Sequence, residues 1–202
     1  MYTPRHFVSP AKETLLKILP EASFATLVTS DEAGLPLASH LPLSYDPDAG
    51  EFGTVRGHMA RANPHWKLLT GRPSLIIFSG PHTYVSPRDY ASNVNVPTWN
   101  YVAVHAYGEM NLLEDVASVR AVLDGLTAEN EQGRPSPWDL SEIEEKRSSA
   151  MMKAIVAFEM PISRLEGKAK LGQNKSVEDR AALKEAAKGM EIEEWQKSVL
   201  SD

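Results

Sequence analysis

Short runs of β-branched and apolar residues, each ended by a dense turn, constrain this chain more than any other feature of its sequence. Residues 24–29 read Phe-Ala-Thr-Leu-Val-Thr and end at the turn Asp-Glu-Ala-Gly, after which residues 35–45 place apolar side chains at 37, 41, 43 and 45. This pattern predicts a β-hairpin. A second turn, Asp-Pro-Asp-Ala-Gly at 46–50, leads into another strand-like run over 51–59. We therefore expect three consecutive antiparallel strands here.

Further strand-like runs follow along the chain, over residues 74–79, 84–87, 96–113 and 154–160. The first two are separated by Gly80-Pro81, and the run over 96–113 is long enough to need a bend, which we expect near Gly108. These runs come in series and do not alternate with helices. The sequence therefore predicts a mainly β (α+β) fold of five to seven antiparallel strands, a small barrel or roll, and disfavours a Rossmann fold.

Helical patterns are short and lie in the connections or at the C-terminal end. Apolar spacing and capping residues predict helices over residues 12–19 (ending at Pro20), 65–70, 116–130, 176–188 and 190–200. The helix over 65–70 has the clearest start, because Asn63 is a good N-cap and Pro64 suits the first helical position. We expect a main domain over residues 1–175 and a helical extension over 176–202, packed on the barrel or on a partner subunit.

Composition excludes several classes of protein. The chain has no cysteine, so disulfides, thiolate metal sites and cysteine nucleophiles are ruled out. Its net charge of −6 argues against a protein that binds nucleic acid along its whole surface, since phosphate backbones are repelled on average. No apolar run has the length of a membrane helix, and the first seven residues show no export signal. A cytoplasmic location without membrane contact is the expectation.

The usual catalytic and metal-binding patterns are also missing. The six histidines show no helical pair spaced by four residues and no His-x-His pair, so we expect no metal. There is no Gly-x-Ser-x-Gly elbow, and Gly53 and Gly57 do not fit a phosphate loop or a dinucleotide fingerprint. Any chemistry is expected to depend on a borrowed cofactor.

Three dense polar clusters remain. In the segment 57–66, Arg61 precedes a helix start, a combination that suits a phosphate monoester, although an arginine that caps the loop or pairs with a carboxylate fits equally well. Residues 97–101, Pro-Thr-Trp-Asn-Tyr, followed by His105, fit either a strand in the core or the wall of a ring pocket. Residues 167–176, with three lysines, a glutamine and an asparagine, are typical of a solvated surface loop.

Together with the opening segment, these clusters resemble the PaiB-type FMN-binding family of the flavin-binding split-barrel superfamily, described as negative transcriptional regulators. The resemblance covers residues 1 to about 176. It rests on Tyr-x-Pro-x-His-Phe at 2–7, Gly-His-Met-Ala-Arg-Ala-Asn-Pro at 57–64, Tyr-Val-Ser-Pro at 84–87, Val-Pro-Thr-Trp-Asn-Tyr-x-x-Val-His-x-x-Gly at 96–108 and Lys-x-Lys-Leu-x-Gln-Asn at 168–174. It implies a six-stranded antiparallel split barrel with short peripheral helices, forming a homodimer with FMN at the subunit interface.

The resemblance also implies a set of cofactor-binding residues. We expect Arg61 and the loop at Asn63 to bind the FMN phosphate, with His58 assisting by a hydrogen bond. Ser39 and His40 are expected at the isoalloxazine edge. The residues expected to close the site, some of them from the second subunit, are Thr98, Trp99, Asn100, Lys170 and Gln173.

This chain departs from the family pattern in one loop and two single positions. The loop over residues 88–95 is shorter than expected, and Asn93 stands where a lysine is usual. Gly172 replaces a serine and Lys175 replaces an arginine. These departures bear on substrate contacts and phosphate affinity more than on the fold.

The resemblance leaves two classes of activity open. The protein is either a flavin-dependent regulator or sensor, or an FMN-dependent oxidoreductase that uses NAD(P)H, and the fold does not decide between them. A third alternative is a weak DNA-binding repressor. Tight reading of a DNA sequence is not expected, because the helix over 116–130 carries only Arg120 against four acidic residues in or beside it.

Overall fold

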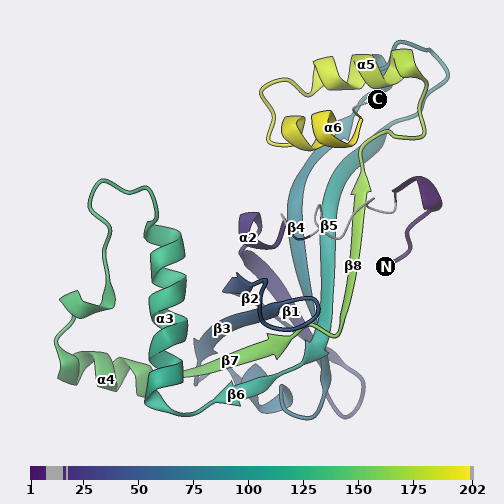
Figure 1. The fold of residues 1–202 in the computed structure, drawn as a ribbon. Coiled ribbons are helices and arrows are strands. Elements are labelled where there is room, and N and C mark those ends of the chain that lie inside the picture. The colour runs from purple at the N-terminus through teal and green to yellow at the C-terminus, as the bar shows by residue number, and fades with distance from the viewer. Residues whose placement is uncertain (8–15, 17, 201–202) are drawn as a thin grey trace. The chain divides into compact units, whose positions relative to one another are not determined.

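The computed structural model describes residues 1–7, 16 and 18–200, and the chain forms two compact units (Figure 1). The central unit comprises Leu19–Phe78 and His105–Leu165. The terminal unit comprises Met1–Ile18, Ser79–Val104 and Glu166–Asp202. Each unit is thus built from segments that are far apart in the sequence.

The central unit contains the three consecutive strands predicted from the sequence. β1 (Phe24–Ser30), β2 (Pro36–Asp46) and β3 (Thr54–Ala60) pair antiparallel in that order, with Leu27 opposite Ser39 and Leu43 opposite Gly57. β7 (Ile155–Pro161) pairs with β3, and the short β6 (Asn111–Leu113) pairs with β7. Alternate residues of β1 are buried, as the two-residue period of a half-buried strand requires.

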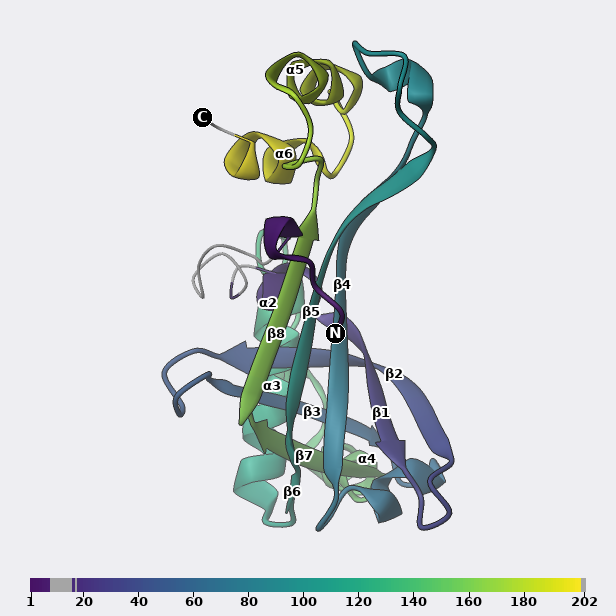
Figure 2. The same cartoon turned by 90° about the vertical axis from the view of Figure 1, so that its right-hand side faces the viewer.

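The sheet as a whole has eight strands, in the order β6-β7-β3-β2-β1-β4-β5-β8, and not the six that we expected. The long strands β4 (Pro73–Val85) and β5 (Thr98–Glu109) each continue from one unit into the other. One added strand is β8 (Arg164–Lys170), which lies beside β5 (Figure 2) and falls partly in the segment interpreted as a surface loop. In this strand charged residues alternate with Leu165, Gly167 and Ala169, a two-residue period that is typical of a strand but was not recognised because the segment is so highly charged.

β4 is also continuous where a break was predicted. Thr26 of β1 pairs with Ile77 of β4, so Phe24, the first residue of β1, lies opposite Ser79. Pro81 lies beyond the end of β1, and its missing N–H therefore removes no hydrogen bond to that strand. A Cβ on Gly80 would lie 3.2 Å from the carbonyl oxygen of Val102, so the glycine allows a close approach of β4 and β5. The Gly-Pro pair therefore marks tight packing inside a strand and not its end.

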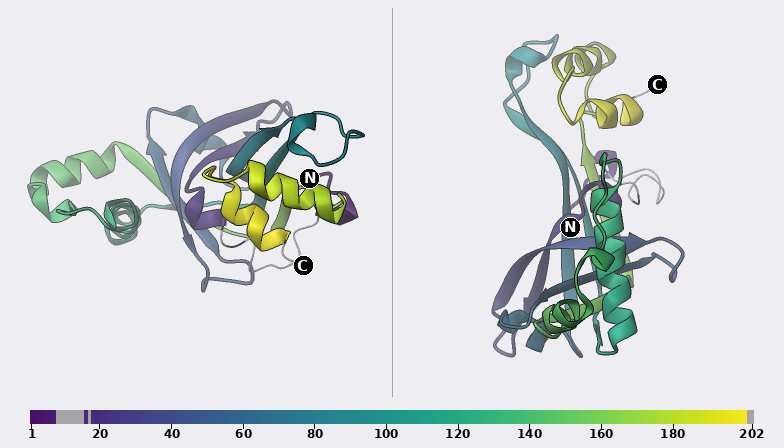
Figure 3. Two further views of the ribbon diagram at one scale, coloured as in Figure 1. Left: turned by 90° about the horizontal axis from the view of Figure 1, so that it is seen from above. Right: turned by 90° about the vertical axis from the view of Figure 1, so that its left-hand side faces the viewer.

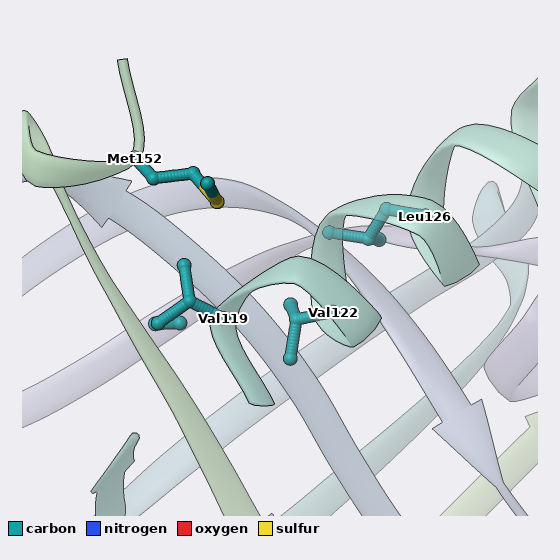
Figure 4. Packing of buried hydrophobic residues seen from close by; sticks show 5 residues of the cluster. Val119, Val122, Leu126 and Met152 are labelled. Atoms are coloured by element: carbon teal, nitrogen blue, oxygen red, sulfur yellow. The ribbon is translucent and has the colours of Figure 1, made fainter. Parts of the chain in front are cut away.

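Helices of the central unit cover its sheet and supply a second core. α3 (Val116–Glu131) has its N-cap at Asp115, and α4 (Glu145–Lys153) follows after the short 3₁₀ helix η4 (Leu140–Glu142). Val119, Val122 and Leu126 of α3 pack against Met152 of α4 (Figure 4). Burial of such side chains contributes about 1.5–3 kcal/mol each relative to exposure, which fixes α3 in place. The predicted helix over 116–130 is thus confirmed.

The terminal unit ends in two helices, α5 (Val177–Ala186) and α6 (Glu193–Val199), which pack on each other (Figure 3). The Ser176 side chain caps α5, as the sequence predicted. The predicted helix over 12–19 lies largely outside the described residues. The described residues of this region include the helix α2 (Ile18–Glu21), which contains Pro20. None of the described helices is both long and apolar enough to cross a bilayer.

The shortened loop over residues 88–95 is held by a buried carboxylate. After the 3₁₀ helix η3 (Pro87–Asp89), the backbone N–H and hydroxyl of Ser92 donate to Asp179 at 2.8 and 2.9 Å, and Asn95 Nδ2 donates to it at 3.0 Å. These bonds hold the pKa of Asp179 below its usual value. The loop is therefore tied to α5.

Candidate functional site

A polar cluster in the central unit joins two of the predicted residues to a third that the sequence did not indicate. Asn63 Nδ2 donates to Ser39 Oγ at 3.0 Å, and the same hydroxyl lies 2.9 Å from Nδ1 of His65. Asn63 also caps the 3₁₀ helix η2 (Pro64–Leu68), its Oδ1 accepting from the His65 backbone N–H at 3.1 Å. The cap predicted from Asn63-Pro64 is thus present, and it brings the loop after β3 onto β2.

His65 is the residue that sequence reasoning missed. Its side chain is fully buried, its Nε2 has no hydrogen-bond partner among the described residues, and burial lowers its pKa. Burial therefore disfavours the charged imidazole, and Nε2 is a buried ring nitrogen whose partner the described residues do not supply. The N-cap places position 65 in the first turn, but its burial depends on contacts with β2 that no local pattern encodes.

Arg61 lies in the same loop, two residues before Asn63, and is exposed. Its Nε donates to the carbonyl oxygen of Lys153 at 3.0 Å and an Nη donates to that of Ile155 at 2.8 Å. The guanidinium carbon lies 5.8 Å from the ring centre of Trp66. A guanidinium has five N–H donors, so three remain for an anion after these two bonds.

In the described part of the chain, the two remaining candidates of this unit, His40 and His58, make no hydrogen bond to that cluster. His40 is next to Ser39 on β2 and so projects from the opposite face, where its Nδ1 lies 3.0 Å from Thr26 Oγ1 and its ring stacks on Phe24. His58, on β3, has a buried Nδ1 without a partner among the described residues, and burial lowers its pKa. Ser39 and His40 therefore do not meet on one side of the sheet.

A cavity of about 530 Å³ opens beside Arg61 in the same unit. Trp66, Val119, Met152 and Ile155 are among its apolar lining residues, and Glu114, Lys153 and Ser149 add polar groups. Its volume falls within the range of small-molecule sites, about 300–1,000 Å³.

The other predicted residues belong to the terminal unit and form a group of their own. Lys170 Nζ donates to the hydroxyl of Thr98 and, at 2.8 Å, to the carbonyl oxygen of Trp99. Asn100 is buried, whereas Trp99 is 53% exposed, so the strand turns its amide inward and its indole outward. Gln173 uses both ends of its amide on the backbone of Ala169 and Leu171 and so holds the turn after β8.

Residues 1–164 match the family model described as "Putative FMN-binding domain". The chain belongs to this family. The family and the flavin cofactor expected from the sequence motifs are thereby confirmed, and the match covers strands β1 to β7, Arg61 and the Ser39-Asn63-His65 cluster.

Relatives and solved structures agree with this assignment. The chain is 34% identical over 181 residues to "Protease synthase and sporulation protein PAI 2" of Bacillus subtilis, covering 89% of this chain and 85% of that protein. Its fold is similar to the FAD and heme binding protein of Mycobacterium smegmatis (TM-score 0.63, 21% identity, 86% of this chain and 78% of that chain). It is also similar to the flavocytochrome Anf3 of Azotobacter vinelandii (TM-score 0.61, 20% identity, 85% and 73%). At this level of identity, these two likenesses concern the fold alone.

Proposed function

We propose that this protein is a homodimer that binds FMN non-covalently through Arg61 and the Ser39-Asn63-His65 cluster, and that it acts as a flavin-responsive regulator. The observation that carries the proposal is the convergence of β2 and the loop after β3 on one polar cluster beside an exposed arginine. When bound, FMN supplies hydride or electron transfer, and the protein supplies binding, orientation and electrostatics.

The chemistry of these residues fits the cofactor. The FMN phosphate carries a charge of about −2, which the three unused N–H groups of Arg61 match. The ring edge of a flavin offers N–H and C=O groups, and the side chains of Ser39 and Asn63 can pair with such groups while the buried His65 holds the Ser39 hydroxyl in place. In this proposal His58, on β3, assists the phosphate by a hydrogen bond.

The outward face of the β1–β2 hairpin supports a dimer. The residues on this face are Phe24, Thr26, Val28, Ser30, Pro36, Ala38, His40 and Pro42, and none of them is charged. Phe24 is 69% exposed. An exposed sheet face without charge is a usual protein-interaction surface, and the occupant we propose is a second copy of this chain, with His40 at the shared interface.

Direct reading of DNA is not part of the proposed role. Arg120 of α3 is paired with Asp124 at 3.2 Å, and on the terminal helices Lys188 and Lys197 are paired with Glu185 and Glu193 at 2.7 Å. Cations that are already paired release few counterions from a phosphate backbone. Regulation is proposed to pass through the flavin.

Flavin titration tests the binding proposal. We expect added FMN to raise the thermal midpoint of the wild-type protein, because a ligand that binds only the folded state stabilises it. Arg61→Ala is expected to weaken this effect, whereas Arg72→Ala, which removes a surface arginine paired with Glu32, is the matched control. Protein that stays colourless with FMN and shows no shift in midpoint would contradict the proposal.

The competing activity is that of an FMN-dependent oxidoreductase, and anaerobic mixing with NADH or NADPH separates the two. A regulator is expected to show no rapid loss of the oxidised flavin absorbance. Rapid stoichiometric bleaching would instead establish a reductase, with NAD(P)H as its partner.

A further inference from the structure

The hydrogen bonds of the Ser39-Asn63-His65 cluster determine which atoms of Asn63 donate and which accept. Asn63 Oδ1 lies 3.1 Å from the backbone nitrogen of His65, and because this N–H group can only donate, the amide end beside it must be the oxygen. The other end of the amide, the NH₂ group, lies 3.0 Å from Ser39 Oγ. The Ser39 oxygen therefore accepts a hydrogen bond from Asn63.

His65 makes the second contact to the same hydroxyl, with its Nδ1 at 2.9 Å from Ser39 Oγ. Burial favours the neutral imidazole, which carries its proton on only one of the two ring nitrogens. A proton on Nε2 would leave a buried N–H group with no acceptor among the described residues. Buried N–H groups without an acceptor are rarer in proteins than acceptors without a donor. The proton is therefore favoured on Nδ1, which then donates to Ser39.

These two bonds leave one direction for the proton of the Ser39 hydroxyl. A hydroxyl oxygen has two lone pairs and one proton, and Asn63 and His65 each donate to one lone pair. The O–H group must then point away from both side chains. Ser39 is only half-buried on β2, so its proton can reach a bound molecule.

We propose that His65 is a positioning residue, which makes Ser39 a dedicated hydrogen-bond donor to an acceptor of the flavin ring, either a carbonyl oxygen or an unprotonated ring nitrogen. This role rests on the proposed function, and it requires no contact between the buried His65 and the ligand. A Ser39 hydroxyl that donated to His65 would instead accept from an N–H group of the ligand. Donation to a ring acceptor also stabilises the reduced ring, which gains electron density, and so raises the flavin potential.

Nitrogen NMR of flavin-free protein, labelled with ¹⁵N-histidine, tests this arrangement without the cofactor. We expect the ring of His65 to be neutral at neutral pH, with its proton on Nδ1. The His65→Phe variant assigns the signals by their loss, and Ser39→Ala should shift them because it removes the acceptor of that proton. A wild-type His65 with its proton on Nε2 would overturn the proposal, whatever the affinity for flavin.

Titration with riboflavin and with FMN tests the consequence for the ligand. Ser39→Ala should weaken both by about threefold to tenfold, because it removes a hydrogen bond between neutral groups at the ring, and it should lower the flavin potential. His65→Phe should have a similar effect alone and little further effect in the Ser39→Ala background, as a double-mutant cycle measures. The matched control is Thr54→Val, which removes a buried hydroxyl that donates to the Ala49 carbonyl oxygen at 2.7 Å.

The outcomes separate this proposal from the proposed function. Flavin binding with an affinity and potential that Ser39→Ala leaves unchanged would overturn the role of His65 and Ser39 alone, as would losses in the two variants that simply add. Wild-type protein that binds no flavin would overturn the proposed function and this role with it. The NMR measurement and the Ser39→Ala comparison decide the matter even if His65→Phe does not fold.

Discussion

The polar cluster of the central unit and the lysine cavity of the terminal unit, which Lys170 and Lys175 line, differ in their electrostatics: the first contains neutral groups and the second contains like charges. Ser39, Asn63 and His65 are neutral groups that bond one another, with burial favouring the uncharged imidazole. Lys170 and Lys175 are like charges held around one cavity, with burial and repulsion opposing the charged form. The first arrangement holds neutral hydrogen-bonding groups in place, whereas the second holds like charges close together. The difference implies that the two sites respond to different substitutions and to different ranges of pH.

Removal of Arg61 is expected to have the largest effect on the flavin. Arg61→Ala should weaken FMN binding by about tenfold to a hundredfold, the usual loss for hydrogen bonds to a charged group. Riboflavin, which lacks the phosphate, should bind the variant and the wild-type protein about equally. Fluorescence titration measures both affinities, and an equal loss for riboflavin would show that Arg61 contacts the ring or supports the fold instead.

The proposed dimer face is the next test of the central unit. Phe24→Glu places a charge on an exposed face, so the monomer should still fold. The dissociation constant of the dimer should be about tenfold or more higher than that of the wild-type protein. Sedimentation velocity measures the assembly state. A control variant, Tyr2→Glu, changes an exposed aromatic residue of the terminal unit. A Phe24→Glu protein that stays dimeric would place the interface elsewhere.

The pH dependence of stability should distinguish the two regions. Burial lowers the pKa of His58 and His65, so below the ordinary pKa of 6.5 the unfolded chain binds more protons and the folded state loses stability as the pH falls. The loss is at most about 1.4 kcal/mol per pH unit for each histidine. Lys170 contributes at alkaline pH. Because its pKa is lowered in the folded state, the unfolded chain binds more protons there, and the free energy of unfolding rises as the pH increases toward 10.5.

Denaturant unfolding between pH 7.5 and 5.5 measures the histidine contribution. His65→Gln should reduce the slope of stability against pH, whatever its effect on stability at pH 7.5. His82→Gln is the control, because His82 is exposed on β4. An unchanged slope in His65→Gln would show that this histidine is protonated, or buried to the same extent, in both states.

The smallest effect is expected at the paired surface lysines. Lys197→Met removes exposed pairs with Glu193 and Glu194 and should not change the affinity for FMN measurably. A clear loss of that affinity in this variant, measured by the same titration, would mean that α6 takes part in ligand binding.

Local patterns in the sequence predicted the elements that local physics determines. Dense turns and a two-residue period gave β1, β2 and β3, and the Asn63-Pro64 pair gave the start of η2. β8 was missed because Glu166, Lys168 and Lys170 make a strand look like a solvated loop, although its apolar residues alternate. The Gly80-Pro81 pair was taken for a break because its position beyond the end of β1 depends on sheet pairing.

The candidate sites show the same limit. The family resemblance implied Ser39, Arg61 and Asn63 as site residues, but nothing in it indicated that His65 would be buried against Ser39. The aromatic side chains of residues 97–101 suggested a core or a ring pocket, yet Trp99 faces outward and Asn100 is the buried member. The phase of a strand is set by the partners on each face, and those partners lie far away in the sequence.

Flavin absorbance during titration with FMN and with riboflavin, in wild-type and Arg61→Ala protein, tests the central claim most directly. The account predicts that wild-type protein retains a visible flavin spectrum through gel filtration and binds FMN about tenfold or more tightly than riboflavin, and that Arg61→Ala removes this preference. Wild-type protein that elutes colourless after incubation with FMN, or that binds riboflavin as tightly as FMN, would contradict it.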